Sequence, residues 1–417
     1  MINAAQLGAR LRDARERRGL SQQAVAEALG LPRTAVTNME TGQRTVSTLE
    51  LTKLADLYAR PVAWLLAQQS SATDDLSIVL PRALPEMQDA PEIGDAIRRM
   101  LDLFGDGAAL RGMLDDTIEQ AVPNYAARLA SAGEAIRQGE MLALEERRRL
   151  GLGSAPIGNI AEMIATQGIW SAATDLPDSL SGLFLNHPSI GLAVIVNVRH
   201  SLVRKRFSYA HEYAHALLDR SETVTTTRRE NATNLVEKRA NAFAAAFLMP
   251  PEGVAEVLRQ LNKGLPSRHG QTLFDVANDR GMDAEIRPRP GSQVITYQDV
   301  AVLARHYGLS YEAAAWRLKS LNHISSLECN ALIARKEIGN RYIRLLGFSD
   351  LLDDTMSSAA AEQELRSQLT RLATEAYRRE EISRERLLEL GQKLGFERVD
   401  LLAFANAARA DQPEVNL

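Results

Sequence analysis

The sequence predicts an α-rich multidomain protein with an all-α helix-turn-helix domain at the N-terminus, an α+β core in the centre and a helical C-terminal region. At 417 residues the chain is too long for one compact core. Short helical patterns separated by glycine and proline fill the first 69 residues, and the clearest strand patterns lie within residues 181–198. We therefore expect a helix-turn-helix domain at 1–69, a linker with connecting helices at 70–140, the α+β core at 141–265, a helical segment at 266–325 and a C-terminal helical region at 326–417.

The composition is typical of a soluble globular protein, with 45% hydrophobic and 24% charged residues. The net charge of -4 gives no global basic signature, so any contact with nucleic acid must come from a local patch. Cys329 is the single cysteine, which excludes an intramolecular disulfide and fits a reducing compartment. No apolar run approaches membrane-spanning length, and arginines occupy the start of the chain where a secretory peptide needs an apolar core. We expect a cytoplasmic protein with no membrane partner.

The N-terminal region reads as short helices joined by tight turns. Ser21 is a typical cap for a helix over Gln22–Leu29, and Gly30 is a typical stop. Pro32 suits the first turn of the next helix, over Arg33–Glu40. Two short helices with a tight turn between them are the arrangement of a helix-turn-helix DNA reader.

The segment SQQAVAEALGLPRTAVTNMETGQRTVSTLELTKLADLY resembles the XRE (Cro/C1-type) helix-turn-helix family, which implies binding to a double-stranded DNA operator. The resemblance implies major-groove or phosphate contacts from Gln22, Arg33, Thr34, Thr37, Asn38, Arg44 and Lys53. Residues 1–69 carry 9 basic and 6 acidic side chains, a net charge of +3 (9 − 6), which is modest and favours a homodimer on two half-sites. The alternative is a helical protein-interaction module whose arginines are a solvated face.

Residues 70–95 have the composition of a linker, with three prolines and an excess of acidic residues over one arginine. Residues 96–149 read as connecting helices, with breaks expected near Gly105–Gly107 and near Pro123. Two strands are expected further on, at Ser181–Asn186 and Leu192–Val198, the second of them apolar and β-branched. A strand beside the helix that follows could hold an extended peptide by strand addition, which is a positional hypothesis.

The stretch from Phe207 to His215, FSYAHEYAH, has the pattern of a zinc peptidase helix. His211 and His215 are four residues apart, so both imidazoles project from one helical face and can bind one metal ion. Glu212 can take a proton from a metal-bound water. A catalytic zinc site usually needs a third protein ligand. Because Leu218 and Ser221 replace the glycine and histidine of a metzincin, the third ligand should be a carboxylate.

The near carboxylates are Asp219, Glu222, Glu230 and Glu237. Asp219 turns away from the shared histidine face, and Glu222 and Glu230 flank the polar run TVTTTRR, which reads as a loop. Glu237 begins an amphipathic helix that can pack against the histidine helix, so it is the best candidate. A donor for the oxyanion is also needed, and the sequence does not choose among Tyr209, Tyr213, His187 and His200.

The segments RKRFSYAHEYAHALLDR and EKRANAFAAAFLMP are similar to the ImmA/IrrE family of zinc metallopeptidases. The resemblance implies a zincin-like fold, Zn2+ as cofactor, His211, His215 and Glu237 as ligands, and Glu212 as general base. It also implies a protein substrate, typically a DNA-binding repressor cleaved under stress, and Ala214 replaces a glycine often found in the motif. Three alternatives stay open: histidines that are ordinary surface residues, a transcription factor whose zincin-like core senses a ligand or partner without cleaving, and a peptidase that never binds DNA.

The C-terminal third carries less information. Residues 268–294 read as irregular. Residues 297–321 predict two helices around Gly308, which resemble the helix-turn-helix-like piece that often follows the peptidase core in the ImmA/IrrE family. They form either a second nucleic-acid or partner surface or a structural hairpin, and the scarcity of basic residues favours the hairpin. Residues 360–410 predict amphipathic helices that serve either a dimer or a sensor.

Overall fold

The structure is a computed structural model, and it describes residues 4–18, 20–58, 62–66, 91–114, 122–125, 129–221, 223–228, 234–264, 269–275, 280–286, 288–347 and 363–403. The chain divides into two compact units, one of residues 1–75 with 370–417 and the other of residues 76–369. Residues 70–90 of the expected linker lie outside the described residues. Each unit is considered by itself.

The N-terminal helices form the expected helix-turn-helix domain. They are α1 (Ala4–Arg17), α2 (Gln22–Leu29), α3 (Arg33–Glu40), α4 (Thr48–Tyr58) and α5 (Val62–Leu66). The Ser21 side chain accepts a hydrogen bond from the backbone N–H of Ala24, which confirms the predicted cap of α2. Buried Arg15 of α1 donates to Glu40 of α3 at 2.6 Å, which ties these helices together around the apolar core. Two further helices, α19 (Gln363–Arg378) and α20 (Arg384–Lys393), confirm the helices expected within residues 360–410.

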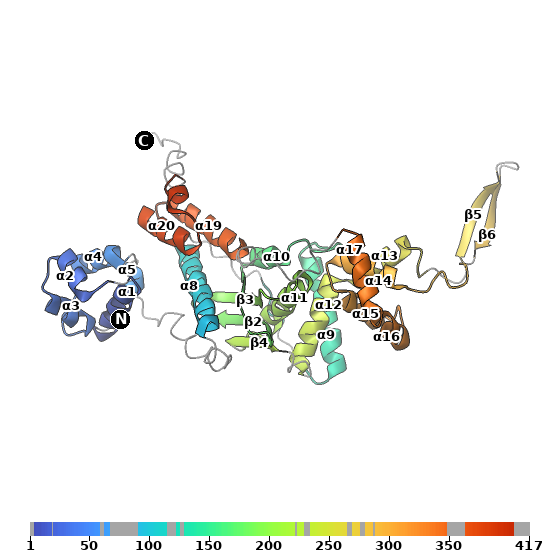
Figure 1. Cartoon of the computed structure of the whole chain (residues 1–417), viewed down its shortest axis with the longest axis horizontal. Coiled ribbons are helices and arrows are strands. Elements are labelled where there is room, and N and C mark those ends of the chain that lie inside the picture. Colours follow the sequence, from blue (N-terminus) through green and yellow to red (C-terminus); the bar gives the residue numbers. More distant parts are fainter. Residues whose placement is uncertain are drawn as a thin grey trace. The chain divides into compact units, whose positions relative to one another are not determined.

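The larger unit contains a four-stranded sheet with the order β1-β3-β2-β4 (Figure 1). Its strands are β1 (Trp170–Thr174), β2 (Leu180–His187), β3 (Gly191–Asn197) and β4 (Val224–Arg228). β1 pairs with β3 in parallel, whereas β2 pairs antiparallel with both β3 and β4. The strands expected at Ser181–Asn186 and Leu192–Val198 are therefore confirmed as β2 and β3. Because β3 lies between β1 and β2, it cannot accept a peptide by strand addition, and β4 is an outer strand instead.

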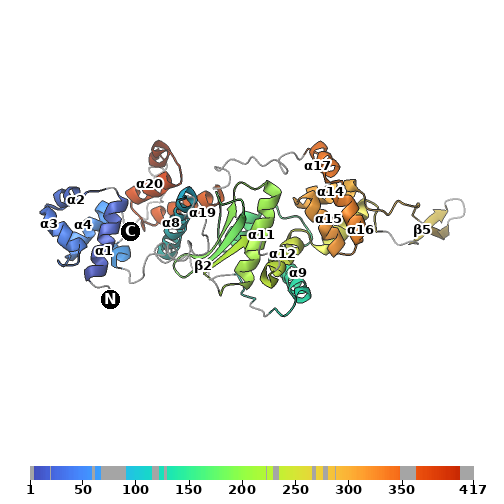
Figure 2. The ribbon, with the colours of Figure 1, turned by 60° about the horizontal axis from the view of Figure 1, so that its bottom comes forward.

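Helices cover both faces of this sheet. α8 (Pro91–Met113) lies on one side and α11 (Leu202–Leu218) on the other in both views (Figure 2). The helix break expected near Gly105–Gly107 is wrong, since α8 continues through these residues. A Cβ atom on Gly107 would lie 2.5 Å from the Trp170 ring, so this glycine lets α8 approach β1 closely. It marks close packing rather than a helix end.

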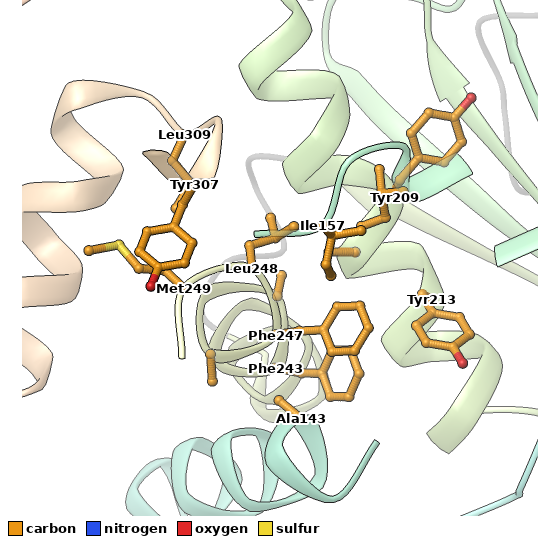
Figure 3. Close-up of a cluster of buried hydrophobic side chains, with 14 of the residues drawn as sticks. Ala143, Ile157, Tyr209, Tyr213, Phe243, Phe247, Leu248, Met249, Tyr307 and Leu309 are labelled. Carbon is orange, nitrogen blue, oxygen red and sulfur yellow. The ribbon is translucent and has the colours of Figure 1, made fainter. Parts of the chain in front are cut away.

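The apolar core of this unit joins α11 to helices that precede and follow it in the sequence. Phe243 and Phe247 of α12 face Tyr213 of α11. Tyr307 and Leu309 lie on the opposite side of α12 (Figure 3). The helices involved are α9 (Ala132–Arg149), α10 (Ile160–Thr166), α12 (Leu235–Leu248), α13 (Pro251–Gln260), α14 (Tyr297–Tyr307), α15 (Tyr311–Ser320), α16 (Ser326–Ile333) and α17 (Lys336–Leu345). Helices α14 to α17 are thus packed into the same core as the histidine helix.

Two buried arginines fix the C-terminal end of α12. Arg147 of α9 donates to the backbone oxygen of Phe247 at 2.5 Å, and Arg317 of α15 donates to that of Met249 at 3.0 Å. These carbonyl groups end a helix and have no partner within it. α9 and α15 therefore both hold the helix that carries Glu237.

Two loop predictions are wrong. The run TVTTTRR contains β4, because threonines and valine suit a strand at the edge of a sheet. Residues 268–294 contain a hairpin of β5 (His269–Asp275) and β6 (Arg280–Ile286), paired antiparallel. Among the described helices, none has the length and apolar character that crossing a membrane requires.

Candidate metal centre

α11 and α12 bring three potential metal ligands together. His211 and His215 lie one turn apart on α11, and their Nε2 atoms are 3.1 Å from each other. Glu237 comes from the first turn of α12, with Oε2 at 3.1 Å from His211 Nε2 and Oε1 at 3.6 Å from His215 Nε2. One donor atom from each side chain lies within 4.8 Å of the others. Two imidazoles and one carboxylate are the donor set of many catalytic zinc sites.

The alternative that the histidines are ordinary surface residues is wrong, since His211 is 2% and His215 0% exposed. Each imidazole also has a partner on its other nitrogen. His211 Nδ1 lies 3.0 Å from Asn241 Oδ1, and His215 Nδ1 lies 3.0 Å from Asp219 Oδ2. Asp219, a possible ligand by sequence, thus contacts the side of His215 that faces away from the cluster. Sequence reasoning missed Asn241, although its place four residues after Glu237 puts both on one helical face.

Glu212 is fully buried beside the ligands, and neither carboxylate oxygen has a hydrogen-bond partner among the described residues. Burial raises its pKa, while the neighbouring His215 and His211 oppose that rise. Thr227 of β4 also favours the charged form, although its hydroxyl makes no hydrogen bond that satisfies distance and angle. Glu212 is therefore a carboxyl group whose proton affinity is enhanced and whose oxygens are not engaged.

Gly182 of β2 forms the wall next to Glu212. A Cβ atom at this position would lie 2.6 Å from Glu212 Oε1 and 3.0 Å from its Cγ. The strand pairing places Thr227 opposite Gly182, so β2 and β4 together flank the carboxylate. A glycine within a strand pattern is the one feature of the sequence that hints at this contact.

The other candidates from the sequence fall into two groups. Glu222 and Glu230 lie outside the described residues. Among the possible oxyanion donors, Tyr213 donates its hydroxyl to Glu146 of α9, and His187 Nδ1 accepts from the backbone N–H of Ser189 at 3.2 Å. Tyr213 is therefore engaged on the α9 side of its helix, away from the ligand cluster.

The candidate DNA contacts lie on and around α3. Arg33, Thr34 and Asn38 are exposed on this helix, and Thr37 is partly buried. Gln22 is held within the domain, because its amide nitrogen donates to Glu40 at 2.8 Å and its oxygen accepts from Thr37 at 3.2 Å.

The two candidate phosphate contacts differ in their surroundings. Arg44 pairs with Glu50 at 2.7 Å, whereas Lys53 is exposed on α4. The exposed set on α3 and α4 matches what DNA contact requires, and the assignment of the individual DNA contacts stays a prediction.

The second hairpin, α14–α15, has no comparable face. Tyr311 and Ala315 of α15 are buried, and the Tyr311 hydroxyl donates to the backbone oxygen of Leu332 in α16. Counted from the turn glycines Gly30 and Gly308, these two positions correspond to Arg33 and Thr37 of α3. α16 therefore covers two of the positions that a recognition helix would present to DNA, which supports a structural hairpin, whereas Trp316, at the position of Asn38, is 49% exposed.

Comparisons with known proteins agree with this geometry. Residues 6–65 match a family model described as a helix-turn-helix domain. Residues 165–273 match the M78 peptidase family model, described as an IrrE N-terminal-like domain. No curated protein matches the chain. The chain therefore combines an XRE-like helix-turn-helix domain with a peptidase-like domain of the ImmA/IrrE type.

Proposed function

We propose that this protein is a cytoplasmic transcriptional regulator with a zinc-dependent endopeptidase activity that cleaves a repressor, or its own chain, in response to stress or another signal. The observation that carries the proposal is the position of Glu212, a buried and unengaged carboxyl group, directly beside two imidazoles and a carboxylate. A buried acid without partners is costly in a structural role and useful in catalysis.

The residues present fit zinc. His211, His215 and Glu237 would hold the ion, and three protein ligands leave a position for water or substrate. A bound zinc ion supplies Lewis-acid chemistry, which lowers the pKa of water and polarises a peptide carbonyl.

Glu212 provides the proton transfer that peptide hydrolysis needs. As water attacks the carbonyl carbon, Glu212 accepts a proton from it, and the same carboxyl group returns the proton to the amine that leaves. The position of Glu212 next to the ligand cluster, with neither oxygen in a hydrogen bond among the described residues, suits both steps.

The helix-turn-helix domain supports a regulatory substrate. A peptidase joined to a DNA reader is brought to operator DNA, where the proteins at high local concentration are repressors and other copies of the same chain. The modest charge of +3 (9 − 6) over residues 1–69 supports a homodimer that reads two half-sites.

The proposal is tested by comparing the wild-type protein with Glu212→Gln, which keeps the side-chain shape and removes the proton acceptor. Proteins cleaved in cells are identified by mass spectrometry, and candidate repressors and the chain itself are then incubated with purified zinc-loaded protein. Glu145→Gln, a change of an exposed glutamate on α9, serves as the control. Cleavage by the wild type and Glu145→Gln but not by Glu212→Gln is expected. Equal behaviour of wild type and Glu212→Gln would remove the peptidase assignment, and regulation that survives Glu212→Gln but not Arg33→Ala would favour a non-proteolytic sensor.

A further inference from the structure

Both candidate histidine ligands carry an oxygen partner on Nδ1. The distances are 3.0 Å from His211 to Asn241 and 3.0 Å from His215 to Asp219. A neutral imidazole has one N–H donor and one acceptor nitrogen, and a carboxylate oxygen can only accept. Nε2 of His211 also faces an acceptor, Glu237 Oε2 at 3.1 Å, so these contacts place the proton of each ring on Nδ1 when a cation occupies the Nε2 side. The lone pair is left on Nε2, the atom that faces the cluster.

The two oxygen partners come from equivalent positions. Asn241 follows Glu237 by four residues on α12, so one face of α12 supplies a ligand and a partner for His211. Asp219 follows His215 by four residues and caps the C-terminal end of α11, where its backbone N–H donates to the His215 oxygen at 2.8 Å. In both cases the partner is placed by the helix that carries a ligand.

Asp219 is itself fixed by a residue of α12. Arg239, 2% exposed, donates to Asp219 Oδ1 at 2.5 Å, while Oδ2 faces His215. α12 therefore reaches both imidazoles, His211 through Asn241 and His215 through Arg239 and Asp219. The two contacts differ in charge, because His215 faces a carboxylate and His211 faces a neutral amide.

We propose that Asn241 and the Arg239–Asp219 pair are positioning residues that hold His211 and His215 in the Nδ1–H tautomer and aim both Nε2 atoms at the metal. This inference rests on the metal site of the proposed function and does not depend on turnover. A carboxylate partner increases the basicity of its imidazole more than an amide does, so the Asp219 contact contributes more to affinity than the Asn241 contact.

Zinc affinity of the full-length protein, measured by competition with a chromogenic chelator, tests the assignment. Asn241→Leu and Asp219→Ala are expected to weaken zinc binding by about 10–100-fold, with the larger loss at Asp219. Asn241→Asp keeps an oxygen acceptor and is expected to retain affinity, and Asp219→Asn is expected to lose less than Asp219→Ala. These two conservative variants keep the test valid if the truncated side chains disturb folding.

Glu140→Ala is the matched control. Glu140 pairs with buried Arg317 at 2.5 Å, so this change also removes a carboxylate from a buried arginine, but Glu140 is not among the groups that contact His211, His215 or Glu237. It is expected to lower stability and leave zinc affinity unchanged. A merely structural role for Asp219 and Asn241 predicts that Asp219→Ala and Asn241→Leu both behave like this control.

The tautomers give a direct readout. Long-range proton–nitrogen NMR spectra of 15N-histidine-labelled, zinc-loaded protein are expected to show Nδ1–H for both residues. Asn241→Leu is expected to alter the His211 signals alone. Wild-type zinc affinity in Asp219→Ala and Asn241→Leu, or Nε2–H at either histidine in the wild type, overturns the proposal. Lost affinity in a protein that never cleaves a substrate would instead refute turnover and leave the positioning roles standing.

Discussion

Replacing Gly182 by alanine should disable the proposed base, Glu212, without touching the proposed metal ligands. The added Cβ atom would lie 2.6 Å from Glu212 Oε1, 3.0 Å from Cγ and 3.1 Å from Cδ. Glu212 is 0% exposed, so its carboxylate has no solvent to move into. Either the carboxylate or strand β2 must therefore shift.

The size of the shift follows from the contact distances. Ordinary van der Waals contact of a Cβ atom begins at 3.4 Å, so the closest pair must separate by 0.8 Å (3.4 − 2.6). Displacement of a reacting group by about 1 Å can lower the rate by about 100-fold. Overpacking of this kind costs about 1–3 kcal/mol of folding stability. We expect a turnover loss of about 100-fold with a fully folded, zinc-loaded protein.

The assay compares single-turnover rates, zinc content and thermal unfolding of Gly182→Ala and the wild type, on a substrate that Glu212→Gln fails to cleave. Gly158→Ala is the control, because a Cβ atom at Gly158 meets nothing within 4 Å. It should retain rate and stability. Wild-type turnover in a zinc-loaded Gly182→Ala protein would refute the argument that Glu212 is held in place by this contact and acts from there.

Three further predictions address other parts of the chain. Chelation of zinc should lower the melting temperature of the wild type but not of Glu237→Ala, because zinc at 100 times its Kd stabilises the folded protein by about 2.7 kcal/mol. An equal shift in both proteins would exclude Glu237 as a ligand. Arg317→Ala should destabilise the peptidase-like unit by about 1–3 kcal/mol in urea titrations, because the Met249 carbonyl loses its partner; an unchanged midpoint would contradict the role of α15 in fixing α12. In gel-shift titrations on a selected operator, Arg33→Ala should relax base preference at one position. Lys53→Ala should reduce the salt slope by about 1 at all sequences, and interchanged effects would revise the DNA-binding face.

The sequence predicted those elements whose signals are local. Ser21 and Gly30 mark the ends of α2 because a capping hydroxyl and a C-terminal glycine act within one helical turn. The spacing of His211 and His215 is likewise a property of one helix. The prediction of Glu237 as a ligand also required that its helix pack against α11. The apolar stripe containing Phe243 indicated that packing in the sequence.

The features that were not predicted depend on contacts between distant segments. Gly107 looked like a helix break, and its reason for being glycine is Trp170 on a strand more than sixty residues later. The threonines of β4 looked like a loop, because a strand at the edge of a sheet lacks the apolar alternation of a buried one. Arg239 and Asp219 are ordinary charged residues in sequence, and their pairing becomes apparent when α11 and α12 lie together.

The polar cluster in the core of the larger unit also argues for cation binding over a structural role. His211, Glu212, His215 and Glu237 are 2%, 0%, 0% and 5% exposed, and two of them are acids. Burial raises the pKa of Glu212 and the charge of Glu237 adds to that rise, while the neighbouring His215 and His211 oppose it. A structural cluster would be more stable with apolar side chains of similar volume. A bound divalent cation would neutralise the charge of both carboxylates and accept the lone pairs of both Nε2 atoms. The arrangement that lowers the stability of the metal-free fold therefore favours metal binding. Glu212 is not one of the three ligands, and its oxygens make no hydrogen bond among the described residues. A proton acceptor for hydrolysis needs such a free oxygen.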